Sequence, residues 1–301
     1  MRRFAMLVTT AAVVIAAAAA PTTAGARNLV PRHGVLWGAF PNESSGVAGL
    51  QAKVGRKLAV YIKYEPWTFS HWKSFAGPLH DRRVPIISWS AAPTTNAAAI
   101  ANGSQDRIIL RAARHLRALK HPLFLRPFYE FDQPSGHPRN IGSPGAVIHA
   151  WRRTFRLFRS AGAANVRFVW SPIAADFANH TAQQFWPGRR FLNWIGPDGY
   201  NFPGKTWHSW PEIFNTAYKF SLAHNAPMMI PEVASPVNDP RTPGWITKGA
   251  KWIRHHTGVK SVTWFDSMSP KGYNFQLMTN KATLRAFRAW GARPYFHAFA
   301  R

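Results

Sequence analysis

The sequence of 301 residues contains no cysteine and only 12 acidic residues, against 38 Lys and Arg. The absence of thiols excludes cysteine nucleophiles, zinc–thiolate sites and iron–sulfur clusters. A chain of this length can bury enough apolar surface to fold without disulfides. After residue 26 the sequence also lacks an apolar run long enough to span a bilayer, which requires about 20 residues.

The first 26 residues have the pattern of a secretory signal peptide. Arg2 and Arg3 precede an apolar run from Leu7 to Ala20, and Ala24-Gly25-Ala26 offers a cleavage site of the A-x-A type. A membrane helix is the alternative, but the run is alanine-rich and short for a bilayer. We therefore expect a signal peptide over residues 1–26, a secreted mature chain, and one domain over residues 27–301.

The formal net charge of +26 favours anionic partners such as cell-wall polymers, nucleic acid or a membrane surface. The basic residues are scattered through the predicted helices, as in Arg111, Arg114 and Arg117, and no nucleic-acid-binding motif accompanies them. We expect a solvated basic surface, with an anionic cell-wall polymer as a second possible partner and no specific nucleic acid.

Short β-rich runs alternate with helical stretches along the mature chain. Several of the runs are continuously apolar, as expected for strands buried on both faces. The alternation predicts a parallel sheet, and eight units in about 275 residues favour an α/β fold closed into a (β/α)8 TIM barrel. A doubly wound open sheet is the competitor, but no G-x-G-x-x-G follows the first run. The predicted strands are Gly34–Phe40, Leu58–Tyr64, Val84–Trp89, Leu123–Glu130, Val166–Ser171, Trp194–Tyr200, Met228–Val233 and Ser261–Phe265.

The predicted helices lie between these strands and have the periodicity of an amphipathic face. Gly162 and Gly258 stand where two of them are expected to stop. The helical stretches are Ser104–Lys120, Gly145–Gly162, Trp210–His224, Gly244–Thr257 and Asn280–Trp290.

The few acidic residues gather at one end of the predicted strands, which in a TIM barrel is the end that carries the active site. Turn and cap preferences of aspartate explain Asp176 and Asp239. They do not explain Glu130 and Glu232, which lie inside apolar runs. The nine acidic residues at or beyond strand ends are Glu43, Glu65, Glu130, Asp132, Asp176, Asp198, Glu232, Asp239 and Asp266.

Strand alternation predicts that Glu130 and Glu232 both enter the barrel at its rim. Two such glutamates suit retaining glycoside hydrolysis, in which one carboxyl protonates the leaving oxygen and the other attacks the anomeric carbon. The two carboxyl groups are then expected to lie about 5–5.5 Å apart. A structural salt bridge between Arg126 and Glu130 is the alternative, because an unpaired buried carboxylate is costly. The residues of shared parity are Phe124, Arg126, Phe128 and Glu130 in one strand, and Met228, Ile230 and Glu232 in the other.

Four segments in the same order resemble glycoside hydrolase family 26, whose members include β-mannanases with some β-glucanases and β-xylanases. The first resembles the R-P-x-H-E segment of the family, and the second its W-R…G…N-x-x-x-x-W-S-P stretch. The third is similar to D-W-I-G-x-D-G-Y-N, and the fourth to P-x-x-x-x-E-x-G. In this sequence they are Leu125–Glu130, Trp151–Pro172, Asn193–Asn201 and Pro227–Ser235.

The resemblance implies that Glu130 is the proton donor, that Glu232 is the nucleophile and that Tyr200 donates a hydrogen bond to the nucleophile. It also implies that Trp264 and Phe265 offer an aromatic platform for a sugar face. We also count Arg126, Tyr129 and Trp170 within these segments, and Asp132 two residues beyond the first of them, as candidate substrate-binding residues.

The chain departs from the family pattern around both glutamates. Tyr129 stands where the family has histidine and cannot hold a sugar hydroxyl in the same way. Asp132 adds a negative charge close to Glu130, and we expect that charge to raise the pKa of the acid. Val233 and Ala234 replace the segment in which a glycine normally follows the nucleophile.

These observations predict a secreted retaining endo-β-glycanase that acts on β-1,4-mannan or, failing that, on β-glucan or xylan. A catalytically weak barrel that binds cell-wall or extracellular polysaccharide is the alternative. A nucleic-acid-binding protein follows from charge alone, and the signal peptide and the acidic mouth oppose it. We expect no metal and no cofactor, because no H-x-x-x-H pair with a carboxylate is evident. No G-x-S-x-G elbow supports a serine hydrolase either.

Overall fold

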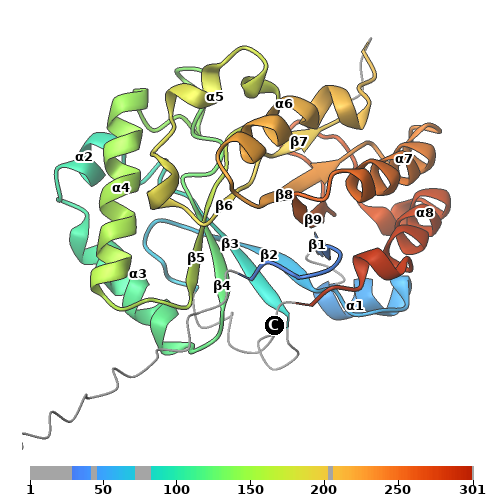
Figure 1. The fold of residues 1–301 in the computed structure, drawn as a ribbon, viewed down its shortest axis with the longest axis horizontal. Helices are drawn as coiled ribbons and strands as arrows, with labels where there is room; N and C mark the ends of the chain where they lie inside the picture. Colours follow the sequence, from blue (N-terminus) through green and yellow to red (C-terminus); the bar gives the residue numbers. More distant parts are fainter. Residues whose placement is uncertain (1–28, 42–45, 72–82, 203–205, 300–301) are drawn as a thin grey trace, which may run out of the picture.

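The computed structural model describes residues 29–41, 46–71, 83–202 and 206–299, in which parallel strands form a closed barrel surrounded by helices (Figure 1). All of its neighbouring strands pair in parallel, and pairings of β8 with both β6 and β7 complete the ring. The predicted TIM barrel is therefore confirmed. The predicted signal peptide and Glu43 lie outside the described residues. The strands are β1 (Leu36–Phe40), β2 (Val60–Glu65), β3 (Val84–Trp89), β4 (Leu123–Pro127), β5 (Val166–Trp170), β6 (Trp194–Ile195), β7 (Gly199–Tyr200), β8 (Met228–Ala234) and β9 (Val259–Phe265).

The sixth position of the barrel is shared by β6 and β7, because the predicted strand over 194–200 is interrupted. A Cβ on Gly196 would lie 2.4 Å from Cγ1 of Val169, so the chain passes its neighbour at a distance that only glycine permits. Pro197 follows and has no N–H to contribute to the sheet. The interruption leaves Asp198 between the two short strands.

Helices cover the outside of the barrel, and all five predicted helices are present within a few residues of their expected ends (Figure 1). The start of α6 shows why the local sequence suits a helix: Ser209 and Glu212 form a reciprocal capping box ahead of its apolar face. The helices are α1 (Gly46–Val54), α2 (Ala97–Ala101), α3 (Asp106–Ala118), α4 (Pro144–Ser160), α5 (Thr181–Gln184), α6 (Trp210–Ala223), α7 (Thr242–His255) and α8 (Lys281–Gly291). Short 3-10 turns cover Ala175–Phe177, Arg189–Phe191, Leu277–Thr279 and Pro294–Phe296.

The core has two layers, which follow the alternation of side chains along each strand. A small inner cluster fills the barrel and includes Val60, Ile86, Phe124 and Met229. A much larger outer cluster lies between the strands and the helices. Nine of the 14 tryptophans are fully buried, and all except Trp194 belong to this outer layer. Most of the tryptophans therefore attach helices to the barrel and do not line a cleft.

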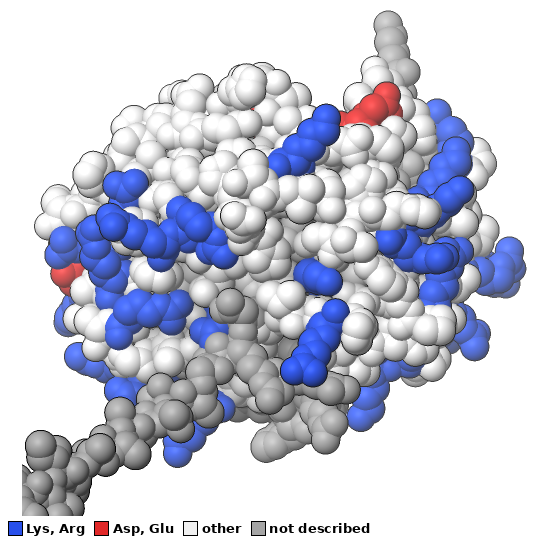
Figure 2. All heavy atoms as spheres, viewed as in Figure 1, with Lys and Arg blue, Asp and Glu red and all other residues white. Residues whose placement is uncertain are grey.

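The surface is strongly basic in the described part of the chain. Figure 2 shows Lys and Arg over the helices on both sides of the visible face, with very few acidic atoms among them. On this face the basic residues are thus spread over separate helices. None of the described helices has the length and apolar character needed to cross a membrane.

Candidate active site

Glu232 reaches the barrel mouth through an irregularity in β8. Met229 points into the barrel, whereas Met228 and Ile230 belong to the outer cluster. The register between β8 and β9 shifts between Ile230 and Val233, which changes the phase of the strand. The expectation that Met228, Ile230 and Glu232 share one side is therefore wrong, although Glu232 does enter the mouth.

Three donors hold the carboxylate of Glu232, which is only 3% exposed. The hydroxyl of Tyr64 and Nη1 of Arg126 each donate to Oε1 at 2.8 Å, and the hydroxyl of Tyr200 donates to Oε2. Burial by itself would raise the pKa of Glu232. The charges of Arg126 and Arg139 and the two tyrosine hydrogen bonds outweigh burial and hold the pKa below its usual value. The side chain is an ionised, oriented carboxylate, as a nucleophile requires.

Arg126 is fully buried and organises the charges at the base of the mouth. Besides Glu232, its guanidinium contacts Asp198, Ser171 and Ser88, with Nε 3.0 Å from Oγ of Ser171. The salt bridge considered between Arg126 and Glu130 is therefore not formed, because Arg126 pairs with Glu232 and Asp198. Asp198 was noted only as one of the clustered acids, although its place in the G-x-D-G-Y segment is a signal for its role.

The charges around Asp198 shift its pKa in opposite directions. Burial and the carboxylates of Glu232 and Glu130 raise the pKa of Asp198, while Arg126 opposes them. The direct contact with Arg126 fixes the carboxyl of Asp198 close to both glutamates.

Glu130 lies beyond its strand, in a turn. The strand β4 ends at Pro127, and Phe128 and Glu130 both have φ of +57°. The turn sends Phe128 into the outer cluster, so the parity expected for that residue is wrong. It directs Glu130 to the mouth, where its backbone N–H donates to the carbonyl of Ser171 at 2.8 Å.

The pKa of Glu130 is raised to about 7. Burial is the largest cause, and the negative charge of Glu232 is the second; Arg139 and Arg126 act against them. Nε of Arg139 lies 2.7 Å from Oε2 of Glu130. A carboxyl that titrates near neutral pH suits a group that first donates and later accepts a proton.

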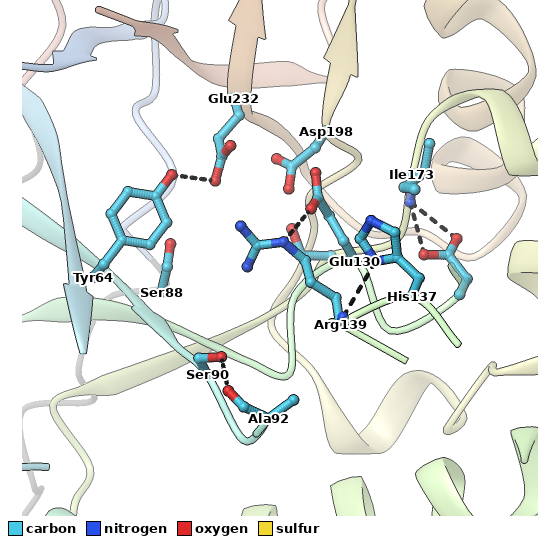
Figure 3. Close-up of polar contacts among 12 residues, drawn as sticks. Tyr64, Ser88, Ser90, Ala92, Glu130, His137, Arg139, Ile173, Asp198 and Glu232 are labelled. Carbon is cyan, nitrogen blue, oxygen red and sulfur yellow. Dashed lines mark hydrogen bonds and ion pairs between the residues drawn. The ribbon is translucent and has the colours of Figure 1, made fainter. Parts of the chain in front are cut away.

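Glu130, Asp198 and Glu232 converge from three different strand ends (Figure 3). One oxygen of each lies within 4.8 Å of the others. The spacing of Glu130 and Glu232 agrees with the short separation of a retaining pair. Within the described residues, this trio is the one group of three or more histidine or acidic side chains close enough together to hold a metal ion. Arg126 and Arg139 already supply positive charge to all three carboxyls.

Tyr129, which replaces the expected histidine, is 5% exposed and lies against two guanidinium groups. Cζ of Arg139 is 4.1 Å from its ring centroid, and Cζ of Arg126 is 5.0 Å away. Burial raises the pKa of Tyr129 to about 12, so its hydroxyl stays protonated. Arg139 belongs to none of the segments that resemble the family, and no sequence signal singled it out.

Asp132 lies near the site but faces away from it. Both of its carboxylate oxygens accept from the backbone N–H of Ile173, at 2.9 and 3.1 Å, and the side chain is 3% exposed. Burial, with the nearby charge of Asp176, raises the pKa of Asp132 itself to about 8. Burial and Glu232 are the main causes of the raised pKa of Glu130, so the expected effect of Asp132 is wrong. We infer that Asp132 attaches the β4–α4 loop to the backbone at Ile173.

Two of the predicted substrate-binding aromatics are core residues. Trp264 is fully buried, points away from the mouth and donates its indole N–H to the carbonyl of Phe275 at 2.9 Å. Trp170 is 1% exposed and belongs to the same outer layer. Both expectations are wrong, and strand parity could have indicated this, because Val169 and Phe265 are the residues of β5 and β9 on the inner side.

Two phenylalanines, Phe265 and Phe202, border the mouth together with its tyrosines. Phe265 is half-buried, with its ring centroid 5.9 Å from that of Tyr200. Phe202 is 42% exposed and stacks on Tyr200, with centroids 5.4 Å apart and an interplanar angle of 24°. Phe202 was not expected from the sequence, although it follows the D-G-Y-N segment directly.

Comparison with known proteins shows which known fold this barrel has. No family model matches the chain. An endo-β-1,4-mannanase from Cellulomonas fimi, described among the glycoside hydrolase family 26 mannanases, aligns over 92% of this chain and 76% of its own. Its TM-score is 0.71 and its sequence identity is 17%. This chain has the fold of glycoside hydrolase family 26. The resemblance indicated by the four sequence segments is thus confirmed at the level of the fold.

Two sequence relatives are also glycan-degrading enzymes by name. Endoglucanase H of Acetivibrio thermocellus is 27% identical over 270 residues, which are 85% of this chain and 30% of that protein. A β-1,3-xylanase of a Vibrio species is 25% identical over 193 residues, which are 62% of this chain and 39% of that protein. The chain therefore spans about a third of the length of these curated relatives.

Proposed function

We propose that this chain is a secreted retaining endo-β-glycanase with Glu130 as general acid/base and Glu232 as nucleophile. The observation that carries the proposal is a close pair of glutamates with opposite pKa shifts, of which one oxygen each lies within 4.8 Å of the other. Environments that push two carboxyl pKa values apart assign one to acid chemistry and the other to nucleophilic attack.

In the first step, the ionised Glu232 attacks the anomeric carbon while protonated Glu130 donates its proton to the glycosidic oxygen. The carbon–oxygen bond to the leaving sugar breaks as the ester bond to Glu232 forms. Tyr64 and Tyr200 hold the attacking carboxylate in one orientation through their hydroxyls. Because all of these donors are fixed in the apo protein, little reorganisation is needed on the way to the transition state.

In the second step, a water molecule attacks the anomeric carbon and the bond to Glu232 breaks. Glu130, now ionised, accepts a proton from that water. Esterification has removed the charge of Glu232, which is the second cause of the raised pKa of Glu130. The pKa of Glu130 therefore falls in the intermediate, when it must act as a base. Release of the product returns both carboxyls to their starting states.

We propose β-1,4-mannan as the first candidate substrate and β-glucan and xylan as the next. The motif resemblance and the fold of the Cellulomonas fimi mannanase favour mannan. The names of the two sequence relatives keep a glucan and a xylan among the candidates. Phe202 and Phe265 offer apolar faces against which a sugar ring can stack.

The test is a reducing-sugar assay of residues 27–301 on glucomannan, galactomannan, mixed-linkage β-glucan and xylan. Glu232→Ala is expected to reduce the release to background. Glu212→Gln is a matched control, because Glu212 is an exposed helix-capping carboxylate outside the mouth. Release that survives in Glu232→Ala would contradict the assignment of the nucleophile. NMR identifies which anomer of the product forms first, and retention predicts that it has the configuration of the substrate.

A polysaccharide-binding barrel with little activity is the second candidate, favoured by the departures from the family pattern at Tyr129 and by the pairing of the acid with Arg139. Glu232→Gln separates the two candidates. A binder shows no turnover in either form and keeps its affinity for the polymer. An enzyme loses turnover in the variant alone.

Secretion and attachment to an anionic cell-wall polymer through the basic surface complete the proposal. Sequencing the N-terminus of the protein from the culture medium tests cleavage after Ala26. Sedimentation with cell walls at low and high salt tests the electrostatic attachment, which screening by salt should weaken.

A further inference from the structure

The mechanism above gives Arg139, the second cation at the mouth, no role of its own toward Glu130. Arg139 lies in the loop between β4 and α4, and its Nε is 2.7 Å from Oε2 of Glu130. The side chain of Arg139 is 30% exposed and that of Glu130 is 14% exposed, so the pair is only partly accessible to solvent. A fixed guanidinium beside a general acid stabilises the ionised form and opposes proton donation. Such a contact works against the first step of the reaction.

The position of Arg139 is held from several sides. Its guanidinium stacks over the ring of Tyr129, and that ring is buried against Tyr64, with centroids 5.7 Å apart. The backbone N–H of Arg139 donates to Nδ1 of His137 at 3.2 Å (Figure 3). Nδ2 of Asn140 donates to the carbonyl of Gln133 at 2.6 Å and closes the loop. The contact with Glu130 is thus preorganised by the surrounding loop.

The other groups that face Glu130 cannot replace Arg139. Glu232 approaches from β8 and Asp198 from the linker between β6 and β7, and both are acidic. Arg126 on β4 is committed to those two carboxyls. Without Arg139, the ionised form of Glu130 would lose its direct ionic partner, and only the less direct charge of Arg126 would oppose the neighbouring carboxylates.

Resting on the proposed function, we propose that Arg139 is a positioning residue that stabilises ionised Glu130 for its role as the base in the second step. Burial and Glu232 supply the protonated acid for the first step. Arg139 favours the ionised form of Glu130, and this form prevails once Glu232 is esterified and has lost its charge. The pairing also fixes the orientation of Oε2 toward the mouth.

The first experiment needs no substrate. The carboxyl carbon of Glu130 is followed by 13C NMR as a function of pH in the folded protein, with Glu130→Gln to assign the resonance. We expect Arg139→Met to raise the midpoint by about one pH unit or more, the size expected for loss of an adjacent opposite charge. Arg139→Lys should give a smaller increase, because it keeps the charge without the planar contact. An unchanged midpoint in a folded Arg139→Met protein would overturn the proposal.

Arg153→Met is the matched control for this titration. Arg153 makes a bidentate pair with Asp106, with both contacts at 2.6 Å, and its side chain is 37% exposed. The pair joins α3 and α4 outside the mouth, so its loss should leave the midpoint of Glu130 unchanged. If Arg139→Met does not fold, the Arg139→Lys and Arg139→Gln variants decide the same question through the direction of the shift.

The second experiment uses a glycoside with an activated leaving group, for which the first step needs no acid. Arg139→Met should lower kcat and KM together, because the glycosyl-enzyme accumulates when the base is impaired. The acidic limb of the kcat profile should move upward, because Glu130 must be ionised in the second step. A rise in KM at constant kcat would overturn the proposal and assign Arg139 to substrate contact. If the wild type cleaves no glycoside, the proposed function fails, while the titration still decides the pairing of Arg139 with Glu130.

Discussion

Replacing Arg126 with methionine tests whether the centre of the barrel depends on charge compensation. The guanidinium is fully buried and contacts two carboxylates, Glu232 and Asp198. Methionine approximates its volume but leaves both acids without their cation. Breaking a buried pair by removing one partner typically costs about 3–5 kcal/mol. Because Glu232 keeps its two tyrosine donors, we expect a loss in the free energy of unfolding of about 4 kcal/mol near pH 8.

The loss should depend on pH in a defined direction. Without Arg126, the pKa of Asp198 in the folded protein rises further above that of the unfolded chain, and the pKa of Glu232 loses the main charge that holds it below its usual value. A carboxyl that is protonated when folded and ionised when unfolded makes stability fall as pH rises from its unfolded pKa, near 4, to its raised folded pKa. The variant should therefore differ little from the wild type near pH 4 and most near pH 8.

Urea unfolding followed by tryptophan fluorescence measures this difference, because nine tryptophans are fully buried. Arg153→Met is the control, since its half-exposed pair with Asp106 should contribute less than about 1 kcal/mol. Adding Asp198→Asn to Arg126→Met should restore part of the stability. A loss below about 1 kcal/mol at pH 8, or an equal loss at both pH values, would refute charge compensation by Arg126. Arg126 would then contribute to stability through packing alone.

Two further predictions concern neighbouring side chains. Tyr200→Phe removes the hydroxyl that donates to Oε2 of Glu232. A hydrogen bond to a charged group is worth about 1.5–3 kcal/mol, so kcat/KM on the cleaved polymer should fall about 10- to 100-fold. A change below about threefold would contradict this prediction. Asp132, with its pKa raised to about 8 by burial, keeps a proton in the folded state that the unfolded chain loses. Wild-type stability should therefore decline between about pH 4 and pH 8, by at most about 1.4 kcal/mol per pH unit from this group. Asp132→Asn should flatten that decline in Tm measurements and still accept from the N–H of Ile173; an unchanged slope would exclude Asp132 as its source.

The sequence alone determined the barrel and its two central glutamates. Continuous apolar runs separated by amphipathic helical stretches are compatible with few architectures other than a closed parallel sheet. Glu130 and Glu232 stood out because carboxylates are scarce in this basic chain and rarely occur within apolar runs. Parallel strands bring their C-terminal ends to one face, so residues distant in sequence were expected to meet there.

Only the tertiary structure decided which side chains pair in the mouth. The route of Glu130 depends on a turn with positive φ, and that of Glu232 on a register shift between β8 and β9. Neither departure is encoded in the alternation of apolar residues, because each arises from the fit of one strand against its neighbours. The partners of Arg126 and Arg139 follow from these departures. A change of one residue in phase moves a side chain to the opposite face of the barrel wall.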